Sequence, residues 1–334
     1  MLSMVSAVTH RAIASLIVLA AAVFAALPAR AAGVALNVTH WQEGMYGVPF
    51  AVALEKGYFK EAGLDVSGFL TSQGGGSTVR NALASEVPYG EVALPAAIAA
   101  IKQGVPLVIV HAGVVSVADL VWVAKKDSPI GSWKDMKGKT LGYSSPKSVT
   151  DMVSTMALSA NGLLKDVTRK PIGNQSSGMT ALREGAADVI YMTEPVYSRE
   201  KANLKIAFRS TDGLPGLTQT VGIVHRDFLK KNPGIITAII EARRKGVEFI
   251  RKNPAEAAEI LARAYKLEPA VAKSAIDGIM GTPGTYWSPG QFDYPGMDAM
   301  LKGLQLVGAV ESGPFDWSSV IDESLLPADL RSKR

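Results

Sequence analysis

The sequence contains no cysteine among its 334 residues. Disulfides, thiolate metal sites and a lipid anchor on a cysteine are therefore excluded. Histidine is scarce as well: the four are His10, His40, His111 and His225, and none are paired at the spacing of a metal site. There is no Walker A sequence and no Gly-x-Ser-x-Gly element, the marks of a phosphate loop and of a hydrolase nucleophile. We expect neither a metal nor a cofactor.

A strong charge of either sign is also absent. Lys and Arg number 35 against 30 Asp and Glu, a formal net charge of +5. Without Arg11 and Arg30, which lie in the expected leader, the balance is about +3 (33 basic against 30 acidic residues). This charge is too small to indicate a nucleic-acid partner. Beyond the leader, no apolar run is long enough to span a bilayer.

The first 31 residues have the layout of a secretory signal peptide. A short leader ends in His10 and Arg11, an apolar run with Ser15 as its one polar residue covers residues 12–27, and Pro28-Ala29-Arg30-Ala31 supplies small residues for cleavage. The apolar run is short for a spanning helix, so a membrane anchor is the less favoured alternative. We expect export to the periplasm, with cleavage near Ala31 or Ala32.

Strands alternate with helices along most of the remaining chain. The pattern predicts strands at 34–39, 64–70, 91–94, 106–111, 140–143, 169–172, 188–192 and 205–208. Such alternation is typical of an α/β fold with parallel sheets, whose ligands lie at the carboxyl ends of the strands. Two longer strands, 119–126 and 217–225, are interpreted as crossings between two α/β units. The chain after them is expected to be mainly helical.

Two small-residue loops each precede a predicted helix. The first is Gly74-Gly75-Gly76-Ser77-Thr78, in which glycine permits positive φ and a close approach to a ligand. Ser77 or Thr78 could cap the helix, whose free N–H groups would then favour an anion or a polar ligand. A flexible turn is the alternative, and these residues alone do not decide. Ser144-Ser145-Pro146-Lys147-Ser148-Val149-Thr150 is the second loop.

Aromatic and acidic residues near these loops are further candidates. Trp41 and Tyr46 lie in the loop after the first strand, so we expect them to contact a ligand, although core packing is the commoner role of such residues. Glu194 follows a strand of buried type and precedes Pro195. For Glu194, a ligand or interdomain contact and a solvated carboxylate both remain open.

Several segments resemble one known family. Residues 53–66 read ALEKGYFKEAGLDV and look like the signature of the solute-binding proteins of ABC importers for nitrate, taurine, alkanesulfonates and thiamine-type pyrimidines. The runs DMKGKTLG (135–142), LREGAAD (182–188), TEP (193–195) and NPAEAA (253–258) resemble further elements of that family, in order. One departure is Pro88, where relatives often carry an acidic residue. The motifs are specific for the family and not for a ligand.

The resemblance implies a type II periplasmic binding fold, in which two α/β lobes are joined by two crossing strands. Lobe 1 would comprise 32–120 and 220–334, and lobe 2 would comprise 121–219. The expected partners are a small molecule and an inner-membrane ABC permease with its ATPase, and the protein is expected to be a monomer. From the loops and the resemblance, the expected ligand-binding residues are Trp41, Gln42, Tyr46, Gly75, Gly76, Ser77, Thr78, Leu94, Pro95, Ser144, Ser145, Ser148, Thr150 and Glu194.

The function implied is capture of one small organic molecule by closure of the lobes. An organic anion, such as a sulfonate, with an apolar or aromatic part is the first expectation. A neutral or cationic nitrogen heterocycle paired with Glu194 is the alternative. A pyrimidine-synthesising enzyme and a binding module for a sensor kinase also remain open. The signal peptide and the lack of a histidine cluster disfavour the enzyme.

Overall fold

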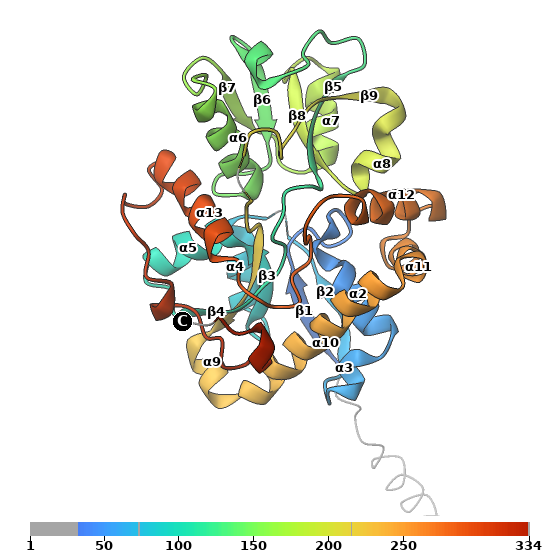
Figure 1. Cartoon of the computed structure of the whole chain (residues 1–334), viewed down its shortest axis with the longest axis vertical. Coiled ribbons are helices and arrows are strands. Elements are labelled where there is room, and N and C mark those ends of the chain that lie inside the picture. Colours follow the sequence, from blue (N-terminus) through green and yellow to red (C-terminus); the bar gives the residue numbers. More distant parts are fainter. Residues whose placement is uncertain (1–32, 73, 215, 333–334) are drawn as a thin grey trace, which may run out of the picture. The chain divides into compact units, whose positions relative to one another are not determined.

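The computed structural model describes residues 33–72, 74–214 and 216–332. The expected signal peptide, residues 1–31, lies outside the described residues. From Val34 onward the chain builds two five-stranded sheets with helices packed on them (Figure 1). We call each sheet, together with the loops at the ends of its strands and the helices that begin there, a lobe.

The first lobe is built on a sheet with the strand order β2-β1-β3-β10-β4. Its strands are β1 (Val34–Val38), β2 (Val66–Leu70), β3 (Tyr89–Ala93), β4 (Leu107–Ala112) and β10 (Thr220–His225). β1 is parallel to β2 and β3, whereas β10 is antiparallel to β3 and β4. The expected parallel sheet is therefore mixed, because a distant strand enters between β3 and β4.

The second lobe repeats this arrangement with the order β7-β6-β8-β5-β9. Its strands are β5 (Leu120–Lys125), β6 (Thr140–Tyr143), β7 (Thr168–Pro171), β8 (Val189–Thr193) and β9 (Leu204–Arg209). β6 is parallel to β7 and β8, and β5 is antiparallel to β8 and β9. In both sheets the antiparallel strand is the fourth in order.

The chain passes between the lobes through two segments, 113–119 and 210–219, which we call the crossing segments. They are hydrogen-bonded to each other where Gln219 N donates to Val114 O at 2.7 Å. The strands expected at the crossings do form, as β5 and β10, but each belongs to one sheet. The residues just before them make the crossing. The expected limits of the lobes in the sequence stay a prediction.

The helices follow the strands and cover the sheets. They are α2 (Val48–Glu55), α3 (Tyr58–Glu61), α4 (Gly76–Leu83), α5 (Leu94–Lys102), α6 (Val149–Ala160), α7 (Gln175–Arg183), α8 (Val196–Glu200), α9 (Arg226–Lys231), α10 (Pro233–Lys252), α11 (Pro254–Tyr265), α12 (Pro269–Met280) and α13 (Tyr294–Leu306). The 3-10 helices are η1 (Met45–Gly47), η2 (Trp133–Met136), η3 (Lys201–Asn203), η4 (Trp317–Ser319) and η5 (Ala328–Leu330). Within the described ranges, no helix is both long enough and apolar enough to cross a membrane.

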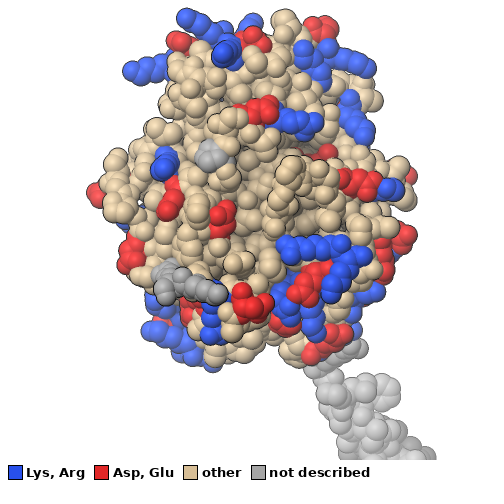
Figure 2. Space-filling model, viewed as in Figure 1, with Lys and Arg blue, Asp and Glu red and all other residues tan. Residues whose placement is uncertain are grey.

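The long helix α10 illustrates how the pattern determines packing. Ile236, Ile239, Ile240 and Val247 are spaced to share one face and are buried, and α10 packs on α2. On the outer face, Arg244 pairs with glutamates three residues before and four residues after it. Figure 2 shows basic and acidic side chains interspersed in the region of α10, which is not the single-sign patch typical of nucleic-acid binding.

Candidate functional site

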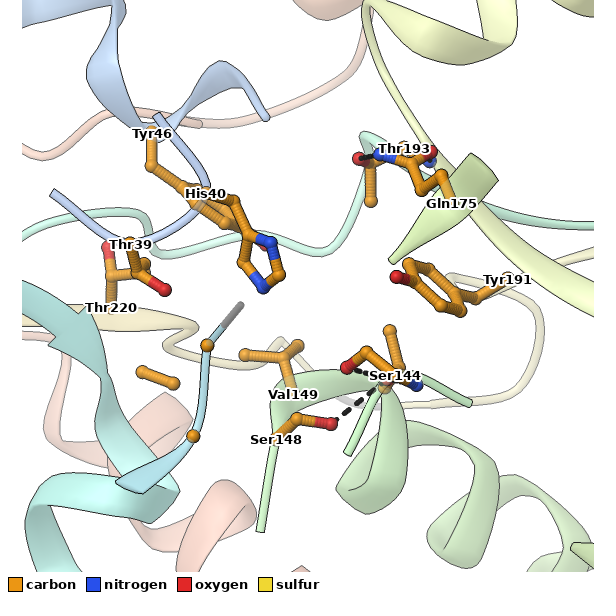
Figure 3. Close-up of a pocket in the computed structure, with 14 residues that line it drawn as sticks. Thr39, His40, Tyr46, Ser144, Ser148, Val149, Gln175, Tyr191, Thr193 and Thr220 are labelled. Atoms are coloured by element: carbon orange, nitrogen blue, oxygen red, sulfur yellow. Dashed lines mark hydrogen bonds between the residues drawn. The ribbon is translucent and has the colours of Figure 1, made fainter. Parts of the chain in front are cut away.

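A pocket lies between the lobes, where the carboxyl ends of the parallel strands of both sheets meet (Figure 3). We call it the cleft. Its free volume is about 20 Å³, room for little more than one water molecule, so the lobes are closed on it in this conformation. The cleft is lined by Thr39, His40, Tyr46, Gly74, Gly75, Ala93, Ser144, Ser148, Val149, Thr150, Gln175, Tyr191, Thr193 and Thr220.

The glycine loop lies close to the second lobe. Gly74 and Gly75 have φ values of 81° and 58°, a conformation that side chains rarely adopt. A Cβ on Gly75 would lie 3.1 Å from Ser145 Oγ and 3.3 Å from Pro146 O. A Cβ on Gly74 would lie 2.5 Å from His40 Nε2. The lack of side chains here is therefore what lets the two loops meet.

Thr150 organises the facing loop of the second lobe. Its Oγ1 accepts a hydrogen bond from Ser144 N at 2.9 Å and lies 2.8 Å from Ser144 Oγ and 3.0 Å from Ser148 Oγ. Ser148 also caps α6, because its Oγ accepts from Asp151 N at 3.1 Å. These hydroxyls are buried. The first turn of α6 therefore presents a fixed set of hydroxyls and N–H groups at the cleft.

Gln175, the first residue of α7, bridges the two lobes. Its Nε2 donates to Glu43 O in the first lobe at 3.2 Å and to Thr193 Oγ1 at 3.0 Å. Its Oε1 accepts from Thr193 N at 2.8 Å. One buried side-chain amide thus joins the loop after β1 to β8 when the lobes are closed.

Two rings lie on opposite sides of the cleft, those of His40 and Tyr191 (Figure 3). Tyr191 is buried, and its Oη donates to Gly173 O at 2.8 Å. Burial, with a smaller contribution from the charge of Glu43, raises the pKa of Tyr191 above its ordinary value. Tyr191 therefore stays neutral. His40 has a φ of 51° and places its imidazole over Gly74.

Tyr46 connects the cleft to the crossing segments. Its Oη donates to Gln219 Oε1 at 2.8 Å, and Gln219 Nε2 donates to Asp119 Oδ1 at 2.6 Å. Asp119 is buried. Burial raises the pKa of Asp119 to about 7, the hydrogen bond from Gln219 opposes this, and the charge of Glu194 adds to it. A chain of three side chains thus ends at a carboxyl group that is costly to ionise.

A buried ion pair between Glu91 and Arg243 contacts Thr220, a residue that lines the cleft. Thr220, which lines the cleft, donates from Oγ1 to Glu91 Oε1 at 2.8 Å. Arg243 Nε donates to Glu91 Oε2 at 2.6 Å, and Arg243 Nη1 donates to Ser288 O at 2.7 Å. Both charged side chains are fully buried, so they compensate each other beneath the cleft. Among the described residues, no Lys, Arg, Asp or Glu lines the cleft itself.

The sequence-based site residues divide into two groups. Tyr46, Gly75, Ser144, Ser148 and Thr150 line the cleft. Outside it are Trp41, Gln42, Gly76, Ser77, Thr78, Leu94, Pro95, Ser145 and Glu194. Ser145 is nevertheless at its edge, against Gly75.

Trp41 and Gln42 turn away from the cleft. The ring of Trp41 packs on Phe69 and Tyr265, with centroids 4.4 and 5.1 Å apart. Gln42 is exposed and donates to Ala264 O at 3.0 Å. Trp41 therefore stabilises the first lobe, the commoner role of a large aromatic residue.

The start of α4 differs from the expected cap. The N-cap is Gly75, without a side-chain hydrogen bond, so the prediction that Ser77 or Thr78 caps this helix is wrong. Ser77 Oγ instead donates back to Gly74 O at 2.7 Å, and Thr78 Oγ1 donates to Thr39 Oγ1 at 3.3 Å. These two hydrogen bonds stabilise the conformation of the glycine loop.

Leu94, Pro95 and Glu194 also lie outside the cleft. Leu94 is fully buried in the hydrophobic core, and the neighbouring Ala93 reaches the cleft in its place. Pro95 is buried in the first turn of α5. Glu194 lines a second cavity together with Asp119.

Sequence reasoning missed several lining residues: Thr39, His40, Gly74, Ala93, Val149, Gln175, Tyr191, Thr193 and Thr220. Tyr191 and Thr193 lie two residues apart on β8 and so share one face, a pattern that could have identified them. Gln175 lies at the start of a helix that follows a strand, as the residues of the Ser144–Thr150 loop do. Thr220 had no local signal, because β10 joins the first sheet from far along the chain. No group of His, Asp or Glu in the described ranges could hold a metal ion.

Comparison with known proteins agrees with this architecture. A family model described as NMT1/THI5 like matches residues 45–257. The formylaminopyrimidine-binding protein of Halalkalibacterium halodurans is 26% identical over 217 residues, which are 63% of this chain and 64% of that protein. The match thus spans slightly less than two thirds of that relative.

Two solved structures share the fold. The periplasmic aliphatic sulphonate binding protein SsuA from Escherichia coli has a TM-score of 0.70 at 16% identity, covering 86% of this chain and 96% of that one. The periplasmic nitrate-binding protein NrtA from Synechocystis PCC 6803 has a TM-score of 0.70 at 16% identity, covering 91% and 92%. The expected periplasmic binding protein fold is confirmed. Because the family model covers more than half of the chain, this protein belongs to the NMT1/THI5-like family.

Proposed function

We propose that the protein is the solute-binding component of an ABC importer and traps one small molecule in the cleft by closure of its lobes. The observation that carries this proposal is the close approach of Gly75 to Ser145 and Pro146 across the cleft, so close that a single added Cβ would crowd both. In this proposal the exported, monomeric protein works in the periplasm. The crossing segments bend, and the closed form is recognised by the permease.

The ligand class we propose is a small, neutral nitrogen heterocycle. No Lys, Arg, Asp or Glu among the described residues lines the cleft, so a strongly charged ligand would lack a permanently charged partner. The hydroxyls around Thr150 can donate and accept hydrogen bonds, and Gln175 Oε1 has a second lone pair that can accept one. His40 and Tyr191 offer flat faces. Similarity to a formylaminopyrimidine-binding protein supports this class. The order of the two classes expected from the sequence is thereby reversed.

An organic anion is the second candidate, and one observation favours it. Val149 and Thr150 form the first turn of α6 and line the cleft. Free N–H groups and the helix dipole at such a terminus favour negative charge. Calorimetry with a formylaminopyrimidine and an alkanesulfonate separates the candidates. We expect the pyrimidine to bind at least about tenfold tighter, a difference of about 1.4 kcal/mol. Tighter sulfonate binding would contradict the neutral class.

Replacement of His40 by alanine is expected to weaken ligand binding by about tenfold or more, as loss of an enclosed aromatic anchor does. Gln42→Ala is a matched control. Both residues have positive φ, at 51° and 68°, so both changes remove a side chain from the same strained conformation, but the Gln42 side chain bonds to Ala264 outside the cleft. Dissociation constants from calorimetry check this. Equal losses in both variants would remove His40 from the site.

The rival reading, a pyrimidine-synthesising enzyme, has a direct test. Purified protein is incubated with the compound that calorimetry identifies, and the compound is then released by denaturation. Mass spectrometry should recover it unchanged if the protein only binds. A new product that grows with time would support the enzyme.

A further inference from the structure

On the side of the cleft formed by β8 and the start of α7, the hydrogens of the polar side chains are already used within the protein. Gln175 Oε1 accepts from Thr193 N at 2.8 Å, which identifies this end of the amide as the oxygen. Gln175 Nε2 donates its two hydrogens to Glu43 O at 3.2 Å and to Thr193 Oγ1 at 3.0 Å. What remains on this buried amide is one lone pair of Oε1, which can only accept a hydrogen bond.

The Tyr191 hydroxyl on the same side of the cleft can also only accept. Its single hydrogen goes to Gly173 O at 2.8 Å, and a carbonyl oxygen cannot donate in return. Figure 3 shows the Tyr191 phenol extending from β8 toward His40 with its oxygen at the leading end. The lone pairs of this buried oxygen therefore lie at the cleft, where no group of the described residues donates to them.

The first lobe adds a third group of this kind, Tyr46. Its Oη donates to Gln219 Oε1 at 2.8 Å. The direction of this hydrogen bond is determined, because Gln219 Nε2 already donates to Ser116 O and to Asp119 Oδ1. Tyr46, which lines the cleft, thus has no hydrogen left for a solute and retains only acceptor capacity.

Donors lie instead at the start of α6. The hydroxyls of Ser144, Ser148 and Thr150 carry three hydrogens and make two contacts with one another, so one hydrogen of this cluster stays available. The first N–H groups of a helix such as α6 also lack partners within the helix. A solute in the cleft therefore meets acceptors on the side of β8 and donors on the side of α6.

We propose that Tyr191 and Gln175 select a solute that carries an N–H donor, such as an amino group on the heterocycle, and orient that donor toward β8. This inference rests on the solute-binding role proposed for the cleft. An acceptor of the solute on this side would face lone pairs only, and a buried acceptor without a donor costs free energy. A methyl group in the same place would leave the protein oxygens without a partner. A site that hydrogen-bonds an N–H group of its ligand discriminates against the analogue that lacks it.

Calorimetry at pH 8 with 4-amino-2-methylpyrimidine and 2,4-dimethylpyrimidine tests the proposal, because the amino and methyl groups are similar in size and both rings are neutral. The wild-type protein should bind the amino compound at least about tenfold tighter. Tyr191→Phe keeps the ring and removes the acceptor, so it should weaken binding of the amino compound by about tenfold and leave binding of the methyl compound unchanged. Tyr265→Phe is a matched control with no effect expected on either compound, because the buried Tyr265 donates to Gly44 O at 2.9 Å outside the cleft.

Equal affinity of the wild-type protein for the two compounds, or no binding of either, overturns the proposal. So does wild-type affinity of Tyr191→Phe for the amino compound. If Tyr191→Phe weakens both compounds equally, Tyr191 acts only through the structure of its lobe, and the proposal also fails. None of these results removes the solute-binding role of the cleft, which calorimetry with the formylaminopyrimidine and the alkanesulfonate decides separately.

Discussion

Replacement of Gly75 by valine is expected to weaken ligand binding by at least about a hundredfold, or about 2.7 kcal/mol. Gly75 has φ 58° and ψ −148°, a backbone region in which a side chain costs about 1–3 kcal/mol. Its new side chain would also begin 3.1 Å from Ser145 Oγ and 3.3 Å from Pro146 O on the other lobe. The strain lowers the stability of the folded protein, and the clash with the other lobe opposes closure. Calorimetry measures the affinity, and small-angle X-ray scattering should find the lobes apart at saturating ligand.

Gly104→Val separates backbone strain from the contact between the lobes. Gly104 has a φ of 82°, and a Cβ there would meet no atom within 4 Å. This variant should lose stability like Gly75→Val and yet bind ligand with wild-type affinity. If Gly75→Val also binds like the wild type, the two loops do not close on a ligand.

Asp119→Asn is expected to stabilise the protein, and more so at alkaline pH. In the folded protein burial raises the pKa of Asp119 to about 7, from an ordinary value of 3.8. Between these values the folded protein keeps a proton that the unfolded chain has released, so the stability of the wild type falls as the pH rises. Three pKa units correspond to about 4 kcal/mol. The amide never ionises, and its oxygen can still accept from Gln219.

Urea unfolding of both proteins at pH 4 and pH 8 measures this difference. The gain in the free energy of unfolding from Asp119→Asn should approach about 4 kcal/mol at pH 8 and nearly vanish at pH 4, where the wild-type carboxyl is protonated in the folded state. A gain that is the same at both pH values would mean that ionisation of the Asp119 carboxyl does not lower the free energy of unfolding.

The sequence predicted the parts of the fold that depend on local pattern. Alternating strands and helices indicated two α/β units, and the loops around Gly75 and Ser148 do face each other. The strand β10 was predicted, but its position between β3 and β4 was not. The residues of a strand do not indicate which distant strands it pairs with.

Side-chain direction was the harder part of the site. Trp41 and Glu194 were expected at the cleft from their loops, yet one packs on Phe69 and the other turns to a separate cavity. A loop residue can point to several neighbours, and the choice depends on which distant surface has space for it. Gln175 was missed for the same reason: its partner Glu43 lies far away in the sequence.

The Gln175 amide also influences what fraction of empty molecules is ready to receive a solute. Its Nε2 donates to Glu43 O across the cleft, a contact between two protein groups that favours the closed arrangement without needing a solute. If only opened molecules admit the solute, the apparent dissociation constant is the intrinsic one divided by the opened fraction. Each 1.4 kcal/mol by which closure of the empty protein is favoured then weakens apparent affinity about tenfold. A change at this contact between the lobes would therefore shift the solute concentration at which uptake is half-saturated, even if no contact with the solute changed.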